Sequence, residues 1–276
     1  MADRLFRSDR AGGDRPLPKI DATVAHIARV YDYWLGGKDN FAADRAVGDK
    51  VLEIHPETVL SVRANRAFLA RSVRHLAMTE GIRQFLDIGT GLPSANNTHE
   101  VAQAAVPEAR VMYVDNDPIV LAHARALLTS CPSGATAYLD ADIRDTDTIL
   151  AGARQVLDLS RPVAVMLVAV LHMLRDDEDP RGIVSRLMSA VPPGSFLVIS
   201  HLASDVQPET MAEMGRRLNE SMTQQFAMRS RAEVTSFFDG LRLLDPGVVL
   251  THEWRQDSPQ DSANPGVLWA GVARKP

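Results

Sequence analysis

The sequence predicts an α/β fold built around a mostly parallel sheet, and two observations carry this prediction. From residue 81 onward, short apolar runs typical of strands alternate with segments of helical spacing. Such alternation indicates parallel strands joined by right-handed helical crossovers. The last two apolar runs, residues 248–252 and 267–273, are joined by a polar loop without a helix. This ending predicts an antiparallel last strand at the edge of the sheet.

The part of the chain before residue 81 is expected to be helical. Residues 1–19 mix Arg, Asp, Gly and Pro without periodicity, which is typical of a flexible tail. Asp21 can cap a helix that runs to Leu35 and stops at two glycines. Two further helices are predicted over residues 42–54 and 57–79. We therefore expect a tail over residues 1–19, a helical cap over 20–80 and a ligand-binding domain over 81–276.

Within the expected domain, the period of the apolar residues separates strands from helices. The predicted strands cover residues 85–88, 110–115, 135–140, 163–171, 195–201, 248–252 and 267–273. The predicted helices cover residues 97–105, 118–129, 147–157, 179–190, 208–223 and 231–238. Because residues 163–171 are apolar on both faces, their strand should lie in the centre of the sheet.

Composition restricts the class of protein. The chain has 276 residues, 45% hydrophobic, with net charge −5 and no basic block, so extended nucleic-acid binding is not expected. Cys131 is the single cysteine, which suits a reducing compartment. The N-terminus lacks an apolar signal core, and the longest apolar run is about half a membrane span. We expect a cytoplasmic protein without a membrane segment and, because no ligand spacing is found, without a metal site.

The most informative stretch is the turn after the first strand. Asp87 ends the apolar run, and Gly89 and Gly91 follow with Thr90 between them. Two glycines let the backbone turn sharply and bring its N–H groups close to a ligand. The N-terminus of the helix that follows favours anionic groups. The pattern predicts a ligand-binding turn, although a tight structural turn would use the same glycines.

The spacing within this turn separates two cofactor classes. A dinucleotide-binding turn has the pattern G-x-G-x-x-G, and Ser94 stands where its third glycine would be. The pattern D-x-G-x-G instead resembles the first motif of class I S-adenosylmethionine-dependent methyltransferases. That motif often has a further glycine where this chain has Pro93.

Three other strand ends should lie beside the turn, because such sheets bind ligands at the carboxyl ends of their strands. Asp115, followed by Asn116, could accept hydrogen bonds from both ribose hydroxyls, in a methyltransferase or in an NAD enzyme. Alternatively, Asp115 caps the next helix and binds no ligand. By resemblance to methyltransferases, Asp142 and Ile143 after the third strand would hold the adenine, where NAD enzymes do not typically use an acid. Ala169 ends the fourth strand and joins this set.

Together the motifs D-I-G-T-G, V-D-N-D-P and D-A-D-I make residues 81–276 resemble a class I methyltransferase. The chain resembles one bacterial family more closely, and this resemblance covers nearly the whole chain after residue 20. The family consists of predicted S-adenosylmethionine methyltransferases and was formerly described as a domain of unknown function. Its match rests on residues 28–45, 63–74, 81–93 and 111–128, and Pro93 belongs to its pattern. The resemblance implies a Rossmann-like methyltransferase sheet and S-adenosylmethionine as cofactor. It implies no substrate.

The segment Y-D-Y-W-L-G-G-K-D-N-F, residues 31–41, has two interpretations. It can be an amphipathic helix with a glycine stop that packs on the domain. It can also be a lid, in which an aromatic residue such as Tyr31 or Tyr33 stacks on adenine or faces the sulfonium. In that case Lys38 or Arg66 would pair with the methionyl carboxylate.

These observations predict methyl transfer from S-adenosylmethionine to a small-molecule nucleophile. Because such a reaction mainly requires positioning, no catalytic residue is assigned. His172, after the fourth strand, is the candidate, against the alternative that it only bonds local backbone. An NAD(P)-dependent oxidoreductase and a non-enzymatic S-adenosylmethionine-binding regulatory protein are the alternatives. The methionines between the fifth and sixth strands either line an acceptor pocket or pack between helices. The oligomeric state stays open, with a homodimer among the states considered.

Overall fold

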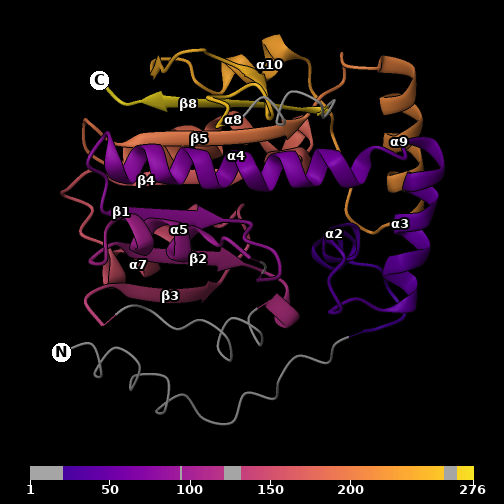
Figure 1. Ribbon diagram of the computed structural model, residues 1–276, viewed down its shortest axis with the longest axis horizontal. Helices are drawn as coiled ribbons and strands as arrows, with labels where there is room; N and C mark the ends of the chain where they lie inside the picture. Colours follow the sequence, from indigo (N-terminus) through magenta and orange to yellow (C-terminus); the bar gives the residue numbers. More distant parts are fainter. Residues whose placement is uncertain (1–20, 94, 121–131, 258–265) are drawn as a thin grey trace.

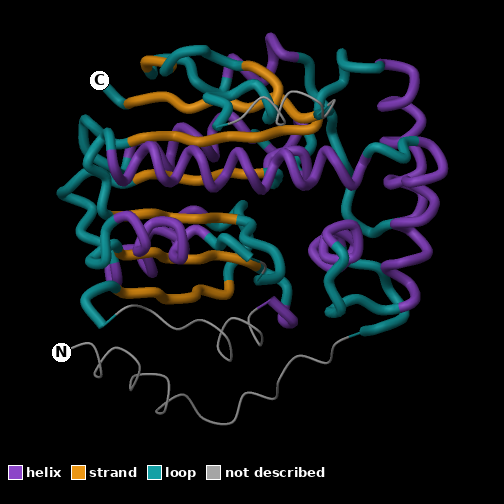
Figure 2. The backbone as a smooth tube through the Cα atoms, viewed as in Figure 1, coloured by secondary structure: helices purple, strands orange, loops and turns teal. Residues whose placement is uncertain are grey.

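The protein is described by a computed structural model that covers residues 21–93, 95–120, 132–257 and 266–276. A sheet is flanked by helices on both faces, and a separate group of helices stands beyond one end of the strands (Figures 1 and 2). The expected tail over residues 1–19 and most of the expected helix over 118–129 lie outside the described residues.

The sheet has the predicted class of topology. Its strands are β1 (Gln84–Ile88), β2 (Arg110–Asp115), β3 (Ala135–Asp140), β4 (Ala164–Val168), β5 (Phe196–Leu202), β6 (Arg242–Leu243), β7 (Val249–Leu250) and β8 (Leu268–Arg274). They are ordered β3-β2-β1-β4-β5-β8-β6, and β7 also pairs with β8. Strands β1 to β5 pair in parallel, whereas β8 runs antiparallel to β5. The mostly parallel sheet, its antiparallel last strand and the central position of β4 are confirmed.

Helices cover both faces of the sheet because each presents one apolar face. The described helices are α2 (Ile27–Leu35), α3 (Ala42–Ile54), α4 (Thr58–Met78), α5 (Thr98–Ala105), α7 (Thr146–Val156), α8 (Pro180–Ser189), α9 (Pro208–Ser221) and α10 (Arg231–Ser236). Helices α4 and α5 form one core with the sheet, and α7, α8 and α10 form the core on its other face. Figure 1 shows α4 crossing in front of the strands.

Two element boundaries differ from the predictions for local reasons. The strand expected over residues 163–171 ends at Val168, because Ala169 adopts a left-handed backbone with φ of 57°. The first helix begins at Ile27, where His26 is the N-cap, whereas the Asp21 side chain accepts a hydrogen bond from the nearby backbone N–H of Thr23. Apolar spacing located both elements but could not show where the backbone leaves them.

Helices α2, α3 and α9 stand beyond the carboxyl ends of the parallel strands (Figure 1). They share an apolar cluster that includes Val30, Val51 and Met211. Behind this cluster the guanidinium of Arg29 donates to the carboxylate of Asp44 over 3.1 Å, and both side chains are buried. The ion pair joins α2 to α3, so the two helices form one unit over the end of the sheet.

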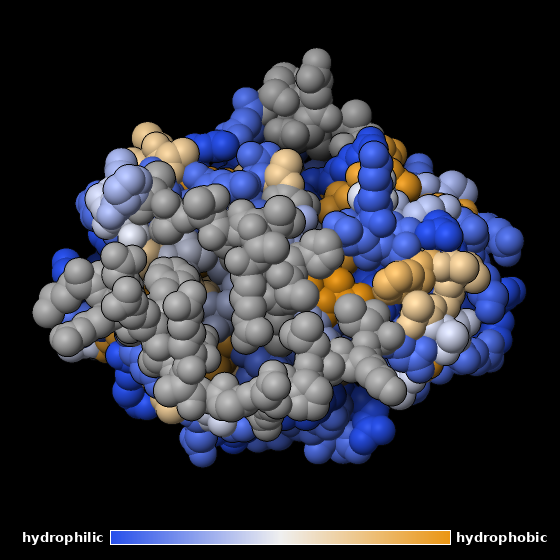
Figure 3. All heavy atoms as spheres, turned by 90° about the horizontal axis from the view of Figure 1, so that it is seen from below, coloured by the Kyte–Doolittle hydropathy of each residue, from blue (hydrophilic) through white to orange (hydrophobic). Residues whose placement is uncertain are grey.

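Polar residues dominate the face seen in Figure 3 among the atoms drawn in colour, with hydrophobic atoms visible near the border between the sheet and the α2–α3 region. Among the described residues, none of the helices is both long and apolar enough to cross a membrane.

Candidate functional site

A cavity lies between the carboxyl ends of the strands and the helices that stand beyond them. Its walls come from β1, β2, β4 and the loops after them, and from α2, α4 and α9. Most of the predicted site residues line it, namely Arg66, Asp87, Gly89, Thr90, Gly91, Asp115, Asn116, Asp142, Ile143, Ala169 and His172. The fold therefore brings together residues more than 100 positions apart in the sequence.

The glycine turn after β1 has the backbone that the sequence pattern predicts. Gly89 has φ of 75°, and a Cβ there would lie 2.4 Å from the side chain of Val170. Gly91 has φ of 66° and no atom within 4 Å of the place where a Cβ would be. One glycine thus allows close packing against the loop after β4, and the other leaves the backbone open to a ligand.

Asp87 lies beneath this turn and is only 3% exposed. Its carboxylate accepts a hydrogen bond of 2.6 Å from the hydroxyl of Thr98, in the first turn of α5. Burial raises the pKa of Asp87 to about 6, although the hydrogen bond from Thr98 acts in the opposite direction. A carboxylate that is hard to ionise in the free protein favours a positively charged ligand beside it.

Asp115 ends β2 and links two turns of the site. One carboxylate oxygen accepts from the Gly91 N–H over 2.8 Å, and the other accepts from the Asp117 N–H over 2.9 Å. Burial raises the pKa of Asp115 as well. Its oxygens are therefore held in place, and each keeps a lone pair for a ligand hydroxyl.

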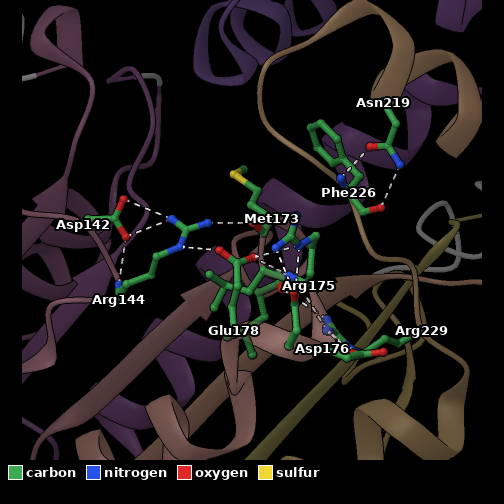
Figure 4. Close-up of polar contacts among 12 residues, drawn as sticks. Asp142, Arg144, Met173, Arg175, Asp176, Glu178, Asn219, Phe226 and Arg229 are labelled. Carbon is green, nitrogen blue, oxygen red and sulfur yellow. Dashed lines mark hydrogen bonds and ion pairs between the residues drawn. The ribbon is translucent and has the colours of Figure 1, made fainter.

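Asp142 belongs to a row of polar contacts at the rim of the cavity (Figure 4). It accepts from the amide of Asn116 over 3.0 Å and from the guanidinium of Arg144 over 3.0 Å. Arg144 continues to Glu178, whose carboxylate lies 2.7 Å from its Nε. Nothing in the sequence assigned Arg144 to the site, because an arginine two residues after Asp142 belongs to no recognised motif. It orients Asp142 and ties it to the loop after β4.

Arg66 comes from α4 and reaches over the glycine turn. Its Nη2 donates to the carbonyl oxygens of Ala95 and Asn96, over 3.2 Å and 3.0 Å. Its Nε is buried without a hydrogen-bond partner among the described residues. A guanidinium in this position can still bind a carboxylate.

Three predicted site residues do not line the cavity: Tyr33, Lys38 and Pro93. The hydroxyl of Tyr33 donates to Asp49 of α3 over 2.6 Å, and Lys38 is exposed in the turn after α2. Tyr31 lines the cavity instead, where its hydroxyl donates to the Val62 carbonyl over 3.1 Å. Residues two apart on a helix point in different directions, so only one of these tyrosines can face the site.

The wall that faces the sheet end is apolar. Trp34 and Leu35 of α2, Met214 and Leu218 of α9, and Phe226 line it and share one hydrophobic cluster. Of the four methionines considered in the sequence, Met214 lines the cavity, whereas Met211, Met222 and Met228 pack in the same cluster without lining it. Helix packing therefore accounts for three of these methionines, and whether the cavity that Met214 lines binds an acceptor stays a prediction.

His172 lies in a short 3-10 turn, Leu171–Met173, after β4. Its ring stacks on Phe226 with centroids 5.9 Å apart, and it meets His201 edge-on at 5.6 Å. Its Nδ1 is buried without a hydrogen-bond partner among the described residues. Burial, followed by the nearby His201 and Arg229, holds the pKa of His172 well below its ordinary value. The imidazole is therefore neutral.

Arg229 fixes the turn that carries His172. It is buried, and it donates to the carbonyl oxygens of Leu171 and Leu174 over 3.2 Å and 2.9 Å. It also lies 2.7 Å from the carboxylate of Asp176 (Figure 4) and 2.9 Å from Nε2 of His201. Sequence analysis missed Arg229, since nothing near it in the chain marks it as a partner of the turn after β4.

The described residues contain no cluster of three or more His, Cys, Asp or Glu side chains that could hold a metal ion. The groups that characterise the site are its carboxylates, its neutral histidine and its glycine turn.

Residues 14–276 match the model of a protein family described as S-adenosyl methyltransferase. Among curated proteins, no sequence matches the chain.

Solved structures agree with this match. A DUF574 family protein from Streptomyces avermitilis MA-4680 is 43% identical, with a TM-score of 0.89 over 94% of this chain and 100% of the other. A protein from Thermobifida fusca YX, named as a candidate methyltransferase, is also 43% identical, with a TM-score of 0.86 over 95% of this chain and 98% of its own. The plantazolicin methyltransferase BpumL, solved with SAH, shares only the fold, at 14% identity and a TM-score of 0.51, over 90% of this chain and 94% of its own.

Proposed function

The chain belongs to the S-adenosyl methyltransferase family, and from this premise we propose that it methylates a small-molecule acceptor held under the α2–α3 unit. S-adenosylmethionine is the cofactor of the family. The observation that carries the proposal is one cavity with two kinds of wall. Carboxylates and a glycine turn line the sheet end, whereas apolar side chains and a neutral histidine line the other.

The residues at the sheet end fit this cofactor. The open backbone at Gly91 gives a ligand access to the turn, and Asp115 keeps acceptor capacity for hydroxyl groups. Asp142 and Ile143 would hold the adenine, because they line the cavity after the next strand. The unpartnered Nε of Arg66 would take the methionyl carboxylate.

The electrostatics of the sheet end fit a cationic cofactor. Asp87 and Asp115 are buried, and burial raises the pKa of both. A positive charge beside them favours their ionised forms. Bound S-adenosylmethionine supplies an electrophilic methyl group and a positive charge. The chain's own task is then to hold the acceptor in line and to exclude water.

For acceptors that lose a proton during the reaction, we assign His172 as the base that takes this proton. Its neutral imidazole lines the cavity and has an unpartnered Nδ1. Burial lowers the pKa of His172, which favours the unprotonated form that a general base needs but also weakens it as a base, so the step requires an acceptor hydroxyl that is itself acidic. Arg229 is a positioning residue, since it holds the turn on both sides of His172.

The size of the acceptor, the cellular location and the bacterial origin are also proposals, and they rest on the cavity, the composition and the relatives. A cavity behind α2 suits a small molecule better than an extended polymer, and the net charge of −5 does not favour nucleic acid. The single cysteine supports a cytoplasmic protein. The two relatives at 43% identity come from bacteria, and they support a bacterial origin.

Calorimetric titration with S-adenosylmethionine, S-adenosylhomocysteine and NAD tests the proposal. We expect micromolar binding of both sulfur nucleosides and none of NAD. Asp115→Ala should weaken their binding at least tenfold, because it removes the acceptor oxygens and a contact of the glycine turn. Asp147→Ala, at an exposed aspartate of α7, is the matched control and should bind normally. Binding of NAD alone, as in an oxidoreductase, would overturn the proposal.

Turnover separates an enzyme from a cofactor-binding regulator. The protein is incubated with S-adenosylmethionine and a library of small nucleophiles, and S-adenosylhomocysteine is measured. Production above the acceptor-free rate supports the enzyme, and cofactor binding without any turnover supports the regulator.

A further inference from the structure

We propose that the acceptor is an uncharged, mostly apolar molecule that presents hydrogen-bond donors, one of which is the hydroxyl that becomes methylated. This inference rests on the proposed function and names the class of acceptor for the same cavity. Its basis is the contrast between the apolar wall of the cavity and two polar atoms that this wall leaves without partners.

The wall opposite the glycine turn is apolar and tightly held. Phe226 lies in it because its backbone N–H donates to Oδ1 of Asn219 over 2.6 Å, while the Asn219 amide donates back to the Phe226 carbonyl over 3.2 Å (Figure 4). Met173 and Met214 lie beside it in the same cluster. Phenylalanine and methionine offer flat and adaptable contact to an apolar ring.

This wall also lacks a charge that is free to bind an ionic group. Of the described lining residues on α2, α9, β8 and the loops next to them, Asp32, His26 and Tyr31 are ionisable, and burial raises the pKa of Tyr31, which keeps it neutral. Asp32 accepts from the Asp39 N–H over 3.0 Å and from the Asn40 amide over 2.9 Å. His26 lies 2.8 Å from the carboxylate of Asp117. A charged acceptor would therefore lose its hydration without gaining a counter-ion.

Two side chains that line this part of the cavity, His172 and Gln224, each carry a buried polar atom without a hydrogen-bond partner among the described residues. The atoms are Nδ1 of His172 and Oε1 of Gln224. Nε2 of the Gln224 amide lies 3.4 Å from Nε2 of His26, and this contact orients the amide. Its carbonyl oxygen can only accept a hydrogen bond. A bound molecule that satisfies Gln224 must bring a donor.

The neutral state of His172 selects the reacting group. As the acceptor oxygen bonds to the methyl carbon, the carbon–sulfur bond breaks and its electron pair stays on sulfur. The oxygen–hydrogen bond breaks, and the proton moves to the imidazole of His172, which becomes cationic while the cofactor loses its positive charge. The number of charges in the cavity is unchanged. An anionic acceptor would need no base, and an ammonium acceptor would first have to lose a proton.

A panel of rigid probes tests the inference on the protein saturated with S-adenosylhomocysteine. The probes are 2-naphthol, naphthalene, naphthalene-2-carboxylate and 2-naphthylmethylammonium, and calorimetry measures their binding. We expect 2-naphthol to bind at least tenfold more tightly than either charged probe and several-fold more tightly than naphthalene. With S-adenosylmethionine, mass spectrometry should detect 2-methoxynaphthalene.

Variants of neighbouring glutamines connect the result to the site. A further probe, naphthalene-2,7-diol, carries one donor for His172 and one for Gln224. Gln224→Leu should weaken binding of this diol at least threefold and bring it close to that of 2-naphthol. Gln225→Leu is the matched control, because Gln225 is exposed and its amide donates to the Asn219 carbonyl outside the cavity. His172→Gln should abolish the methyl ether while it retains probe binding.

Each outcome decides between the two proposals. If S-adenosylhomocysteine does not bind, the proposed function fails and this inference fails with it. If S-adenosylhomocysteine binds but a charged probe binds as tightly as 2-naphthol, or 2-naphthol does not bind, only this inference fails. Equal effects of Gln224→Leu and Gln225→Leu would also overturn it.

Discussion

The two ends of the cavity differ in how their polar groups are satisfied. At the sheet end, Asp115 accepts from two backbone N–H groups and Asp87 accepts from Thr98. At the end under α2 and α9, His172 and Gln224 each have a buried atom without a partner among the described residues. The carboxylates of the sheet end are preorganised for one cofactor, although Arg66 keeps an unpartnered Nε there, whereas His172 and Gln224 depend on a ligand to complete their hydrogen bonds.

This difference follows from the source of each wall. The sheet-end groups follow neighbouring parallel strands, whose backbones are fixed by the ladder. The opposite wall is assembled from α2, α9 and the segment that contains Gln224 and Phe226, and apolar packing joins them. Changes at the two ends should therefore affect cofactor binding and acceptor turnover separately.

The largest effect is expected at the glycine turn. Gly89→Ala places a Cβ 2.4 Å from Val170 and forces alanine into φ of 75°, so cofactor binding should fall at least 1000-fold or the protein should unfold. Gly240→Ala has a similar φ of 78° with no atom within 4 Å, and it should cost only about 1 kcal/mol. Calorimetry with S-adenosylhomocysteine and urea unfolding measure both. Equal costs in the two variants would contradict the role of close packing.

The next effect concerns the buried carboxylate at the sheet end. Because the folded pKa of Asp87 is about 6, above the ordinary value of 3.8 for an aspartate, the native state holds this proton more tightly than the unfolded state. Stability is lost as pH rises from about 4 through 6. Asp87→Asn should therefore match the wild type at pH 4 and exceed it by up to about 3 kcal/mol at pH 8.

Urea unfolding at both pH values checks this sign, and cofactor affinity is measured on the same samples. We expect the variant to bind S-adenosylmethionine more weakly, because it no longer offers a negative charge. A stability difference that does not change between pH 4 and pH 8 would contradict the assignment.

A change in Arg229 should disturb the acceptor end alone. Arg229→Met removes the donors that hold Leu171 and Leu174, so kcat should fall about 100-fold while the Kd for S-adenosylhomocysteine changes less than twofold. Arg229→Lys should restore part of kcat. Arg231→Met, at an exposed arginine two residues away, is the control. A parallel loss of cofactor affinity would show that the two ends are not independent.

The smallest effect compares two tyrosines of α2. Tyr31→Phe removes hydrogen bonds to the Val62 carbonyl and from the Asn65 amide, which should lower the free energy of unfolding by about 1 kcal/mol. Because Tyr31 lines the cavity, we expect cofactor affinity to fall as well, by at least twofold. Tyr33→Phe removes a hydrogen bond to Asp49 outside the cavity and should change cofactor affinity less than twofold. Titration of S-adenosylmethionine into both variants decides between the residues, and a larger loss in Tyr33→Phe would restore the original lid hypothesis.

The sequence was most informative where chemistry follows strand order. Asp87, Gly89, Gly91, Asp115 and Asp142 each stand at or just after the carboxyl end of a strand, and parallel topology brings strand ends together without further information. It was least informative for side chains on helices, where Tyr31 and Tyr33 were both candidates and only Tyr31 lines the cavity. Helical direction depends on packing against α3 and α9, which the local pattern does not contain.

By itself, the sequence determined the fold class, the glycine turn and the cofactor family, because these depend on short motifs and on the period of apolar residues. Only the tertiary structure decided that Arg229 holds the turn of His172, that Arg144 ties Asp142 to Glu178, and that Gln224 keeps an unpartnered oxygen. These contacts join residues 34 to 58 positions apart or depend on what remains unpaired after folding. Burial and orientation arise from the packing of distant elements, and a linear pattern does not encode them locally.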